Sequence, residues 1–455
     1  MNYSNILANY VAETNYENIP TATIEWAKKV MLDTLSCAVA GFTMAPEECE
    51  WIDTVVKEMG GVAEATVWKT GMKTSGMNAA LANATMIHTV DFDDTHLDSV
   101  SHLGAAILAV AMAVGEKEKS SGKEVITAFI LGFEVAARVG NAVNKFGRTH
   151  YKYWHPTATM GTIGAAIVAA KLMKLTAKGV EQAMGLGVDQ AMGFRYCIDK
   201  GDYSKSLHPG FAAMRGVLSA HIIKAGGNGP EGLLEFETGF CNAMANPPRM
   251  ECLTEELGKK YYIMTDSLKF FPTIHCSHTG IEAMLNIVAK YNVKHCEITN
   301  IDIRVTELAK GQGMTFDPQT TLAARLSIPY SVATAAVKGR LTLKDFDEES
   351  LANQDVRALM KKITIDSEPK FNETYPKGLV SQVKVTTVSG QLYEELIIYP
   401  KGHPERPVTD KDMMDKYEFL STITWDKSKS EQIKAAMLAL DELTDVSTFV
   451  KAVVS

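Results

Sequence analysis

The sequence TATMGTIGAAIVAAKLM, residues 157–173, is the most informative segment of the chain about its architecture. It is mostly apolar, and Gly161, Ala165 and Ala169 recur at every fourth position. Residues four apart lie on one face of an α-helix, so this spacing predicts a helix with one smooth face. A neighbouring helix can approach such a face closely. We therefore expect a buried core helix in a mainly helical domain.

Helical patterns continue on both sides of this segment. Helix-forming composition with an apolar face predicts several further helices. The pair Gly226-Gly227 is typical of a helix end. The predicted helices are Ile24–Ala40, Asn78–His88, Leu103–Lys119, Lys123–Val143 and Phe211–Ala225.

The pattern changes after about residue 268. Apolar and polar residues alternate over 301–305 and again over 363–365, which is strand periodicity. Residues 383–385 and 392–398 flank Ser389-Gly390, and this arrangement predicts a β-hairpin. A helix is predicted over 278–291, and helices return over 409–420 and 430–440.

These patterns predict a mainly α fold with an inserted α+β domain. The helical domain is expected to comprise residues 1–268 and 402–455, and the smaller α/β lid domain residues 269–401. No long Pro/Gly/Ser linker separates the two, so we expect them to pack together. Neither a GxxxxGK[ST] loop nor a dinucleotide fingerprint is present.

Composition excludes several classes of protein. The 455 residues carry a net charge of -8, which argues against general affinity for nucleic acid or an anionic membrane surface. Seven scattered cysteines without a CxxC pair argue against a disulfide framework or a structural zinc site and fit a reducing compartment. The N-terminus lacks the features of a signal peptide. The longest uncharged stretches, 103–115 and 157–170, are shorter than the ~20 residues that span a bilayer. We expect a cytoplasmic protein without nucleic-acid or membrane partners.

The densest polar cluster is DFDDTH, residues 91–96, which follows an apolar helix. Three carboxylates, a hydroxyl and an imidazole lie together there, and His102 follows just before the next helix. The positive end of a helix dipole favours neutral imidazole, which can act as a base near pH 7. The alternative is that the aspartates and the threonine only cap helices. We favour a functional site, because one cap does not need three carboxylates.

Three further clusters carry imidazoles and lysines. They are YWHPT (153–157), KSLHPG (205–210), which follows Arg195, and KFFPTIHCSH (269–278). A lysine among small polar residues can pair with a substrate carboxylate or stabilise developing negative charge. The alternatives are a satisfied buried histidine and solvated surface lysines. The pair His275 and His278 is a weak metal signal, because no further ligands have metal spacing.

These clusters, in this order, resemble the MmgE/PrpD family, which includes 2-methylcitrate dehydratase, cis-aconitate decarboxylase and iminodisuccinate epimerase. The resemblance covers almost the whole chain. It runs through KKVMLDTLSCAVAGF, HTVDFDDTH, SHLGAAILAVAMA, YWHPTATMGTIGAAIVAAKLMKL, KSLHPGFAAMRG, GPEGLLEFETGF, KFFPTIHCSHTGIEAM and LSIPYSVATAAVKGRLTL.

The resemblance implies a helical domain built from both chain ends, an inserted lid, a homodimer, and catalysis without a metal or an organic cofactor. Carried over by motif, the family's pocket residues are Asp91, Thr95, His102, His155, Lys205 and Lys269. This chain has HLG at 102–104 where the family usually has His-Pro. At the position of the decarboxylase's active-site histidine it has Ile274, and His275 is one place further on.

The resulting hypothesis is a cofactor-free lyase or isomerase acting at a carbon α to a carboxylate of a di- or tricarboxylate. A dehydratase of the 2-methylcitrate type ranks first, an iminodisuccinate-type epimerase second and a cis-aconitate-type decarboxylase third, because of Ile274. The catalytic residues would be Asp91, His102, His155, Lys205 and Lys269. Substrate would also contact Thr95, Arg195, His208 and His275.

Two readings from other classes remain open. Asp91-Phe-Asp93-Asp-Thr95 fits the DxDxT pattern of magnesium-dependent phosphatases, which need a strand directly before the motif; here a helix is predicted. A non-catalytic binding protein is the other reading.

Overall fold

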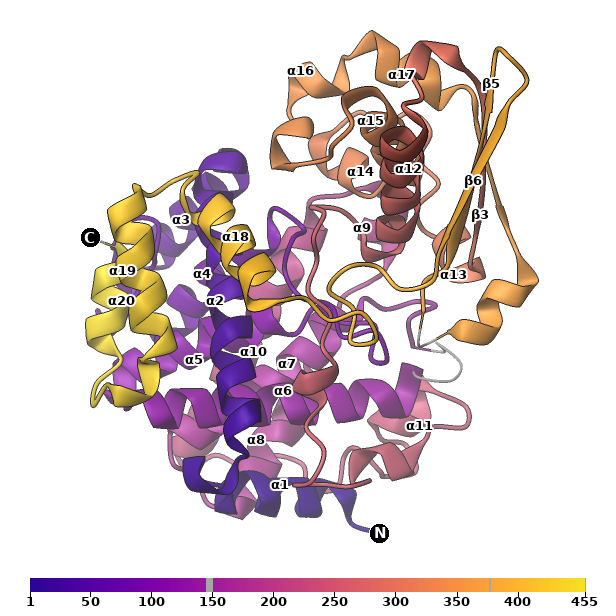
Figure 1. Ribbon diagram of the computed structural model, residues 1–455. Coiled ribbons are helices and arrows are strands. Elements are labelled where there is room, and N and C mark those ends of the chain that lie inside the picture. Colours follow the sequence, from indigo (N-terminus) through magenta and orange to yellow (C-terminus); the bar gives the residue numbers. More distant parts are fainter. Residues whose placement is uncertain (145–149, 376–377, 455) are drawn as a thin grey trace. The chain divides into compact units, whose positions relative to one another are not determined.

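The computed structural model describes residues 1–144, 150–375 and 378–454 and divides into two compact units (Figure 1). The helical unit comprises Met1–Arg195, Ser206–Ser267 and Thr409–Ser455, and the α/β unit comprises Tyr196–Lys205 and Leu268–Val408. The chain is mainly helical with a small mixed sheet, as the sequence predicts. No disulfide joins the seven cysteines, all of which lie within the described ranges.

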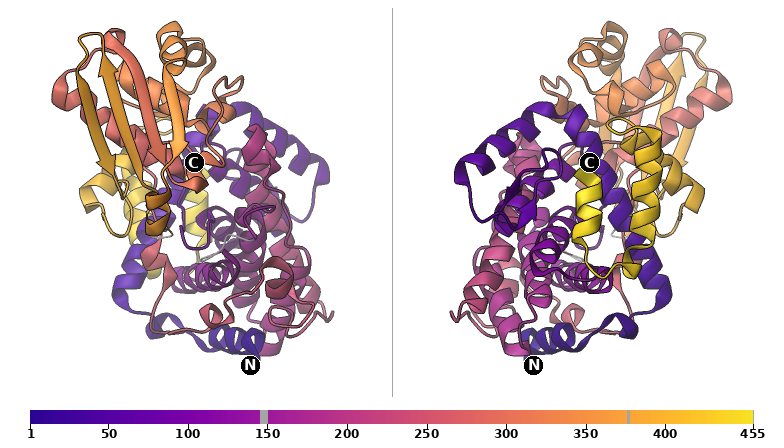
Figure 2. Two further views of the ribbon diagram at one scale, coloured as in Figure 1. Left: turned by 90° about the vertical axis from the view of Figure 1, so that its right-hand side faces the viewer. Right: turned by 90° about the vertical axis from the view of Figure 1, so that its left-hand side faces the viewer.

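The helical unit contains segments from both ends of the chain. Helices α18 and α19 pack on α2, and α20 packs on α5. Figure 2 shows the yellow C-terminal helices beside the indigo N-terminal part of the chain. A two-stranded ribbon, β1 (Ala65–Thr66) with β2 (Lys73–Thr74), is also present. The helices are α1 (Tyr3–Glu13), α2 (Thr21–Met44), α3 (Pro46–Met59), α4 (Gly76–His88), α5 (Gly104–Glu118), α6 (Gly122–Asn144), α7 (Pro156–Leu172), α8 (Ala177–Asp189), α10 (Ser204–Lys224), α11 (Phe240–Met244), α18 (Asp410–Ser421), α19 (Lys427–Leu438) and α20 (Ser447–Val454).

Helix α7 is the buried core helix that the small-residue spacing predicts. It packs against α5, α6 and α8, and every residue from Pro156 to Ala170 is buried. On α6, a Cβ built on Gly132 would lie 3.0 Å from the carbonyl oxygen of Gly164, so the two helix backbones nearly touch. A Cβ on Gly216 of α10 would lie 2.3 Å from the Cβ of Ala165. The small residues therefore set how closely α6 and α10 approach α7.

Helix α6 is long and apolar enough to cross a membrane by length and composition, and it is the one helix among the described residues that meets this test. Its most apolar window is fully buried inside the protein. The core helix of a globular domain has the same properties, so packing inside the helical unit explains the length and apolar composition of α6.

Helix α10 differs from its prediction. It begins at Ser204 rather than at Phe211 and passes through Pro209. A proline removes one intrahelical N–H donor and usually breaks a helix interior. Pro209 lies near the start of the helix, where only one bond is lost and the following turns remain intact.

The α/β unit is built on a four-stranded sheet of order β4-β3-β5-β6. Strands β3 (Ile298–Val305) and β4 (Ile363–Ser367) are parallel, whereas β5 (Ser381–Thr387) is antiparallel to both β3 and β6 (Leu392–Ile397). The predicted hairpin is confirmed, and Gly390 in its turn has a φ of 78°. Val383 and Val385 are buried while Lys384 points outward, as the alternation predicts.

Helices pack on this sheet within the same unit. Helix α12 (His278–Tyr291) has the predicted bounds and contacts β5, β6 and α15 (Ile328–Lys338). Figure 1 shows both helices beside the strands. The remaining short helices are α9 (Tyr196–Lys200), α13 (Glu307–Lys310), α14 (Thr321–Arg325), α16 (Glu348–Leu351) and α17 (Gln354–Met360).

The contact between α6 and α7 yields a stability prediction. In Gly132→Ala the new Cβ would lie 2.4 Å from Cγ2 of Val168, and the Gly164 carbonyl cannot rotate away. We expect a loss of about 1–3 kcal/mol in the free energy of unfolding, measured by urea titration. In the matched control Gly280→Ala the nearest atom lies 3.5 Å away, on Val332, so that helix should be unaffected or stabilised. Equal effects of the two substitutions would contradict this account of the packing.

Candidate functional site

The DFDDTH segment directly follows α4, and every residue from His88 to Leu97 is buried. The chain turns at Asp91, whose φ of 50° lies in the left-handed region that aspartate tolerates. Val100, in the hairpin that follows, has a φ of 58°, which is strained for a β-branched residue. Such strain persists where the surrounding structure imposes it, often at functional sites.

His88, the last residue of α4, forms a buried pair with Asp93. Its Nδ1 lies 2.8 and 3.0 Å from the two carboxylate oxygens. Because a carboxylate accepts, Nδ1–H of His88 is the donor. Both side chains are fully buried. The sequence analysis names Asp91 as a catalytic residue; at His88 the carboxylate contact is made by Asp93.

Asp94 caps helix α5. Its carboxylate accepts the backbone N–H groups of Leu103 at 3.1 Å and Gly104 at 3.0 Å. A Cβ on Gly104 would lie 2.3 Å from Oδ1 of Asp94, so the cap requires glycine there. The capping alternative thus holds for this one of the three carboxylates.

The hydrogen bonds of His102 fix its tautomer. Its Nδ1 lies 2.6 Å from the backbone carbonyl of Asp94 and 3.1 Å from Oγ1 of Thr95. Since a carbonyl only accepts, we assign the proton of the neutral ring to Nδ1 and the lone pair to Nε2. The backbone N–H of His102 donates to Oγ1 of Thr157, which ties it to the start of α7. His102 is therefore arranged to act as a base through Nε2.

His155 is the N-cap residue of α7 and is held by two contacts. Its backbone N–H donates to the carbonyl of Gly193 at 2.8 Å. Its Nδ1 lies 2.8 Å from Nδ1 of His208 on α10, so one ring donates and the other accepts. The structure thus joins two histidines that the sequence analysis assigned to different roles.

The rings of His88, His102 and His155 gather in the helical unit. The ring centroid of His88 lies 4.9 Å from that of His102, and both lie 6.3 Å from that of His155. One nitrogen of each ring lies within 4.8 Å of the others, so among the described residues of this unit these three could hold a metal ion. The absence of a metal stays a prediction.

Further buried acids lie near Asp93. Burial raises the pKa of Asp33, Asp94 and Asp266, and the charge of Asp93 raises each of them further. The pKa of Asp94 reaches about 7. Nζ of Lys416 on α18 lies 2.8 Å from Oδ1 of Asp33, and its charge opposes the increase at Asp33. Helix α18, in the C-terminal segment, thus places the ammonium group of Lys416 beside the buried carboxyl group of Asp33.

The predicted lysines belong to the α/β unit. Lys205 and Lys269 are both buried, which is rare for lysine unless it is paired. His275 begins a short 3₁₀ turn, and its ring stacks on that of His278 at 4.8 Å. The backbone N–H of Ile274 donates to the carbonyl of Arg325. These contacts hold the KFFPTIHCSH segment in place within its own unit.

Arg195 is the last residue of the first segment of the helical unit, Met1–Arg195. Its guanidinium lies 5.1 Å from the centre of the Tyr151 ring, and its backbone N–H donates to the carbonyl of Tyr153. These contacts hold Arg195, which follows α8 in the chain, against the loop before α7. Arg195 is two residues from Gly193, whose carbonyl accepts the backbone N–H of His155. Its role toward substrate stays a prediction.

Sequence reasoning missed His88, Asp33, Asp266 and Lys416. His88 stands three residues before Asp91, at the end of a predicted helix, and a histidine next to an acidic run was the available signal. Asp33 and Lys416 lie far from the motif in sequence and gave no signal of their own.

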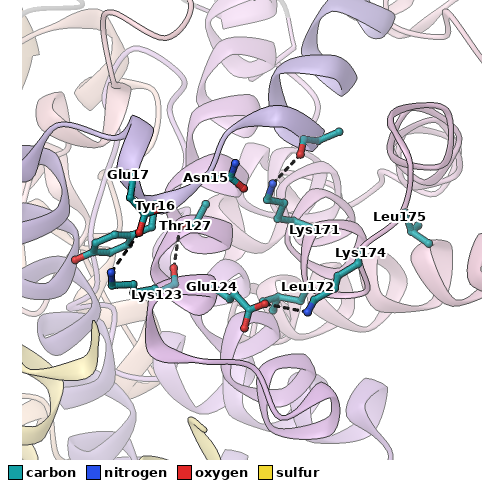
Figure 3. A pocket seen from close by; sticks show the side chains of 11 residues that line it. Asn15, Tyr16, Glu17, Lys123, Glu124, Thr127, Lys171, Leu172, Lys174 and Leu175 are labelled. Carbon is teal, nitrogen blue, oxygen red and sulfur yellow. Dashed lines mark hydrogen bonds and ion pairs between the residues drawn. The ribbon is translucent and has the colours of Figure 1, made fainter. Parts of the chain in front are cut away.

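A separate cavity of about 430 Å³ lies in the helical unit (Figure 3). Its lysines are engaged within the protein: Lys123 pairs with Glu17 and Lys174 with Glu124. Lys171 donates to the backbone carbonyls of Ala12, at the end of α1, and of Thr14, just after it, and burial lowers the pKa of Lys171. None of the predicted site residues lines this cavity.

Comparison with known proteins matches both parts of the chain. The MmgE/PrpD N-terminal domain matches residues 5–253, and the MmgE/PrpD C-terminal domain matches residues 271–442. Cis-aconitate decarboxylase from Aspergillus terreus is 25% identical, covering 97% of this chain and 94% of the relative. The Homo sapiens cis-aconitate decarboxylase is 25% identical, covering 93% and 89%. The 2-methylcitrate dehydratase from Escherichia coli K12 is 26% identical, covering 86% and 84%.

The raised pKa of Asp94 predicts a pH-dependent stability. Between its ordinary value of 3.8 and about 7, the folded protein binds this proton more tightly than the unfolded chain. Stability from this group is therefore present at low pH and lost as pH rises toward 7. Asp94→Asn keeps an oxygen that can cap α5 but does not titrate.

Between pH 5 and pH 8, wild type should lose about 2 kcal/mol more unfolding free energy than Asp94→Asn, measured by urea titration. Asp189→Asn, at an exposed position on α8, is the control and should follow wild type. The assignment is wrong if Asp94→Asn retains the full pH dependence.

Proposed function

The chain belongs to the MmgE/PrpD family, and from that premise we propose that it is a lyase that moves a proton at a carbon α to a carboxylate of a di- or tricarboxylate. The observation that carries this proposal is the cluster of His88, His102 and His155, in which the half-buried His102 has a defined tautomer. An α-proton beside a carboxylate is poorly acidic, so its removal needs a positioned base and support for the developing negative charge.

His102 is the base in this proposal. The Asp94 carbonyl holds its Nδ1–H, which leaves the Nε2 lone pair to remove the α-proton. His155 is the complementary acid, or the base in the opposite direction. Its Nδ1 contact with His208 allows a proton to be shared between the two rings, so His155 can give up a proton and regain one. Thr95 would bind substrate, because its hydroxyl already lies at the His102 ring.

Lys205 and Lys269 supply positive charge in this proposal. A buried ammonium group gains most when it pairs with an anion, and a carboxylate that becomes enolate-like in the transition state is such a partner. Asp91, Arg195 and His275 keep the roles that the family resemblance and the sequence suggest: Asp91 in catalysis, and the other two in substrate binding. No metal or organic cofactor is part of this chemistry.

Dehydration of a 2-methylcitrate-like hydroxy acid is our first choice of reaction. In it, C–H cleavage at the α-carbon is followed by loss of hydroxide from the neighbouring carbon, with one imidazole as base and another as acid. The dehydratase relative from Escherichia coli has the corresponding name. Epimerisation would use the same base and acid without loss of hydroxide.

Decarboxylation is a second candidate reaction, and one specific observation favours it. The relative from Aspergillus terreus named cis-aconitate decarboxylase covers 97% of this chain, whereas the dehydratase from Escherichia coli covers 86%. Here the C–C bond to the departing carboxyl breaks, and the carbanion must be protonated. Ile274 stands where that activity would place a histidine, so His275 would have to take this role.

The phosphatase reading loses its structural basis. The DxDxT pattern of that class follows a strand, but here α4 (Gly76–His88) precedes it. A non-catalytic binding protein would not need the fixed tautomer at His102. We also propose a cytoplasmic homodimer, which rests on the resemblance and on composition.

Substitution of either imidazole tests the proposal directly. His102→Ala and His155→Ala should each lower kcat by about 10²–10⁴-fold, with 2-methylcitrate and cis-aconitate as probe substrates. His295→Ala, at a half-exposed position in the α/β unit, removes an imidazole elsewhere and should leave kcat unchanged. Near-full activity in both site variants would rule out the roles assigned here.

The lysines give a separate prediction. Lys205→Met and Lys269→Met preserve most of the side-chain length but remove the charge, so kcat/KM should fall by about 10²-fold or more. Lys200→Met, exposed at the end of α9, is the matched control. If kcat/KM with every tested polycarboxylate is unchanged in both buried variants, the lysines do not bind the reacting carboxylate.

A further inference from the structure

The cavity of Figure 3 is separate from the proposed catalytic residues and has no role in the chemistry described so far. Its volume of about 430 Å³ lies in the range of small-molecule pockets. Three parts of the chain form it: the segment around the end of α1, the first turns of α6, and the end of α7 with the link that follows. All three belong to the helical unit, so the cavity lies within that unit.

Three lysines and two glutamates line this cavity, and four of these five groups form two ion pairs. Nζ of Lys123 lies 3.2 Å from Oε1 of Glu17, and Nζ of Lys174 lies 3.1 Å from Oε1 of Glu124. The fifth group is Lys171, with which no carboxylate among the described residues forms an ion pair. Burial alone lowers its pKa, without a contribution from a charged neighbour. The lining of the cavity therefore carries one uncompensated positive charge.

The ammonium group of Lys171 has one donor that the protein does not use. Its Nζ lies 3.0 Å from the carbonyl oxygen of Ala12 and 2.7 Å from that of Thr14. An ammonium group has three N–H donors, so the third has no acceptor in the part of the chain that the structure describes. The side chain is only half-buried and the ordinary pKa of lysine is 10.5, so the group stays charged near pH 7. It is therefore able to donate to an anion in the cavity.

The other lining residues determine which anion fits. Leu172 and Leu175 contribute apolar side chains to the cavity. The carboxylates of Glu17 and Glu124 also line it and would repel a second negative charge on the ligand. A molecule with one carboxylate and an apolar part matches both features, whereas a dianion matches only one of them.

We propose that this cavity binds a small monocarboxylate, whose carboxylate accepts a hydrogen bond from the ammonium group of Lys171 and whose alkyl part contacts Leu172 and Leu175. The site does not depend on the proposed function, because none of the proposed catalytic residues lines the cavity. It also differs from the catalytic site in ligand charge, since the proposed substrates carry two or three carboxylates.

Titration with butyrate, followed by NMR of leucine methyl groups, tests this proposal. The methyl signals of Leu172 and Leu175, assigned with Leu172→Met and Leu175→Met, should shift in a saturable manner with a Kd in the millimolar range. The methyl signals of Leu396, exposed on β6 in the other unit, should not shift. Butyramide has the same size without the charge and should bind about tenfold more weakly, and succinate should also bind more weakly than butyrate. The proposal is overturned if butyrate gives no saturable shift, or if butyramide or succinate binds as tightly.

Two variants with opposite expected effects separate binding from folding. Lys171→Met keeps the apolar stem but removes the ammonium group, so the affinity for butyrate should fall about tenfold or more. Because this change also removes two hydrogen bonds, Glu17→Gln at an exposed position is the second variant. It removes a negative charge from the lining and should raise the affinity about two- to fivefold.

Lys178→Met is the matched control for these variants. Lys178 is exposed on α8 and does not line the cavity, so the loss of its charge should leave the affinity for butyrate unchanged. If Lys171→Met is folded and binds butyrate as tightly as wild type, or if Glu17→Gln does not raise the affinity, the assignment of this cavity to a monocarboxylate is wrong.

Discussion

Burial of the acidic DFDDTH loop is the constraint on which the rest of the helical unit depends. A carboxylate removed from water must be paired, hydrogen-bonded or neutralised by a proton, since otherwise its burial costs several kcal/mol. Asp93 is paired with His88, and Asp94 caps α5 through Leu103 and Gly104. The pairing of Asp93 requires the end of α4 to lie at the loop, and the cap formed by Asp94 requires the start of α5 to lie there. The two carboxylates therefore fix where α4 ends and where α5 begins.

The same constraint explains why the C-terminal segment returns to the helical unit. Lys416 on α18 donates to Asp33 on α2 and to the carbonyl of Phe92 in the acidic loop. Its ammonium also lies 4.4 Å from the centre of the Phe92 ring. One buried lysine therefore connects the last helices, the second helix and the loop. Without it, Asp33 would be a buried acid beside Asp93.

Close helix packing supplies the second imidazole. Small residues let α6 and α10 approach α7, and the start of α7 carries His155 and Thr157. Thr157 accepts the backbone N–H of His102, and His208 on α10 contacts His155. The glycine and alanine face that stabilises the core thus also determines how far apart the proposed acid and base lie.

Local patterns predicted the elements well, because periodicity is a local property. The bounds of α12 and the hairpin at Gly390 follow directly from spacing, whereas the start of α10 does not, because the helix passes through Pro209 and begins at Ser204. Motifs in the sequence supplied His102, His155, Lys205 and Lys269 as candidates. They did not supply the partners of buried groups: the contacts of His88 with Asp93, His155 with His208 and Lys416 with Asp33 depend on tertiary packing, which one sequence does not reveal. Capping by Asp94 was an alternative that the composition of the loop alone could not decide.

The central claim is proton transfer at a carbon next to a carboxylate. Its most direct test is to incubate the protein in deuterated water with a panel of di- and tricarboxylates and to follow the carbon-bound protons by NMR. The account predicts incorporation of deuterium at the α-position of at least one substrate or product, accompanied by loss of water or carbon dioxide or by inversion. Turnover of a polycarboxylate with no exchange or new deuterium at that carbon would contradict it.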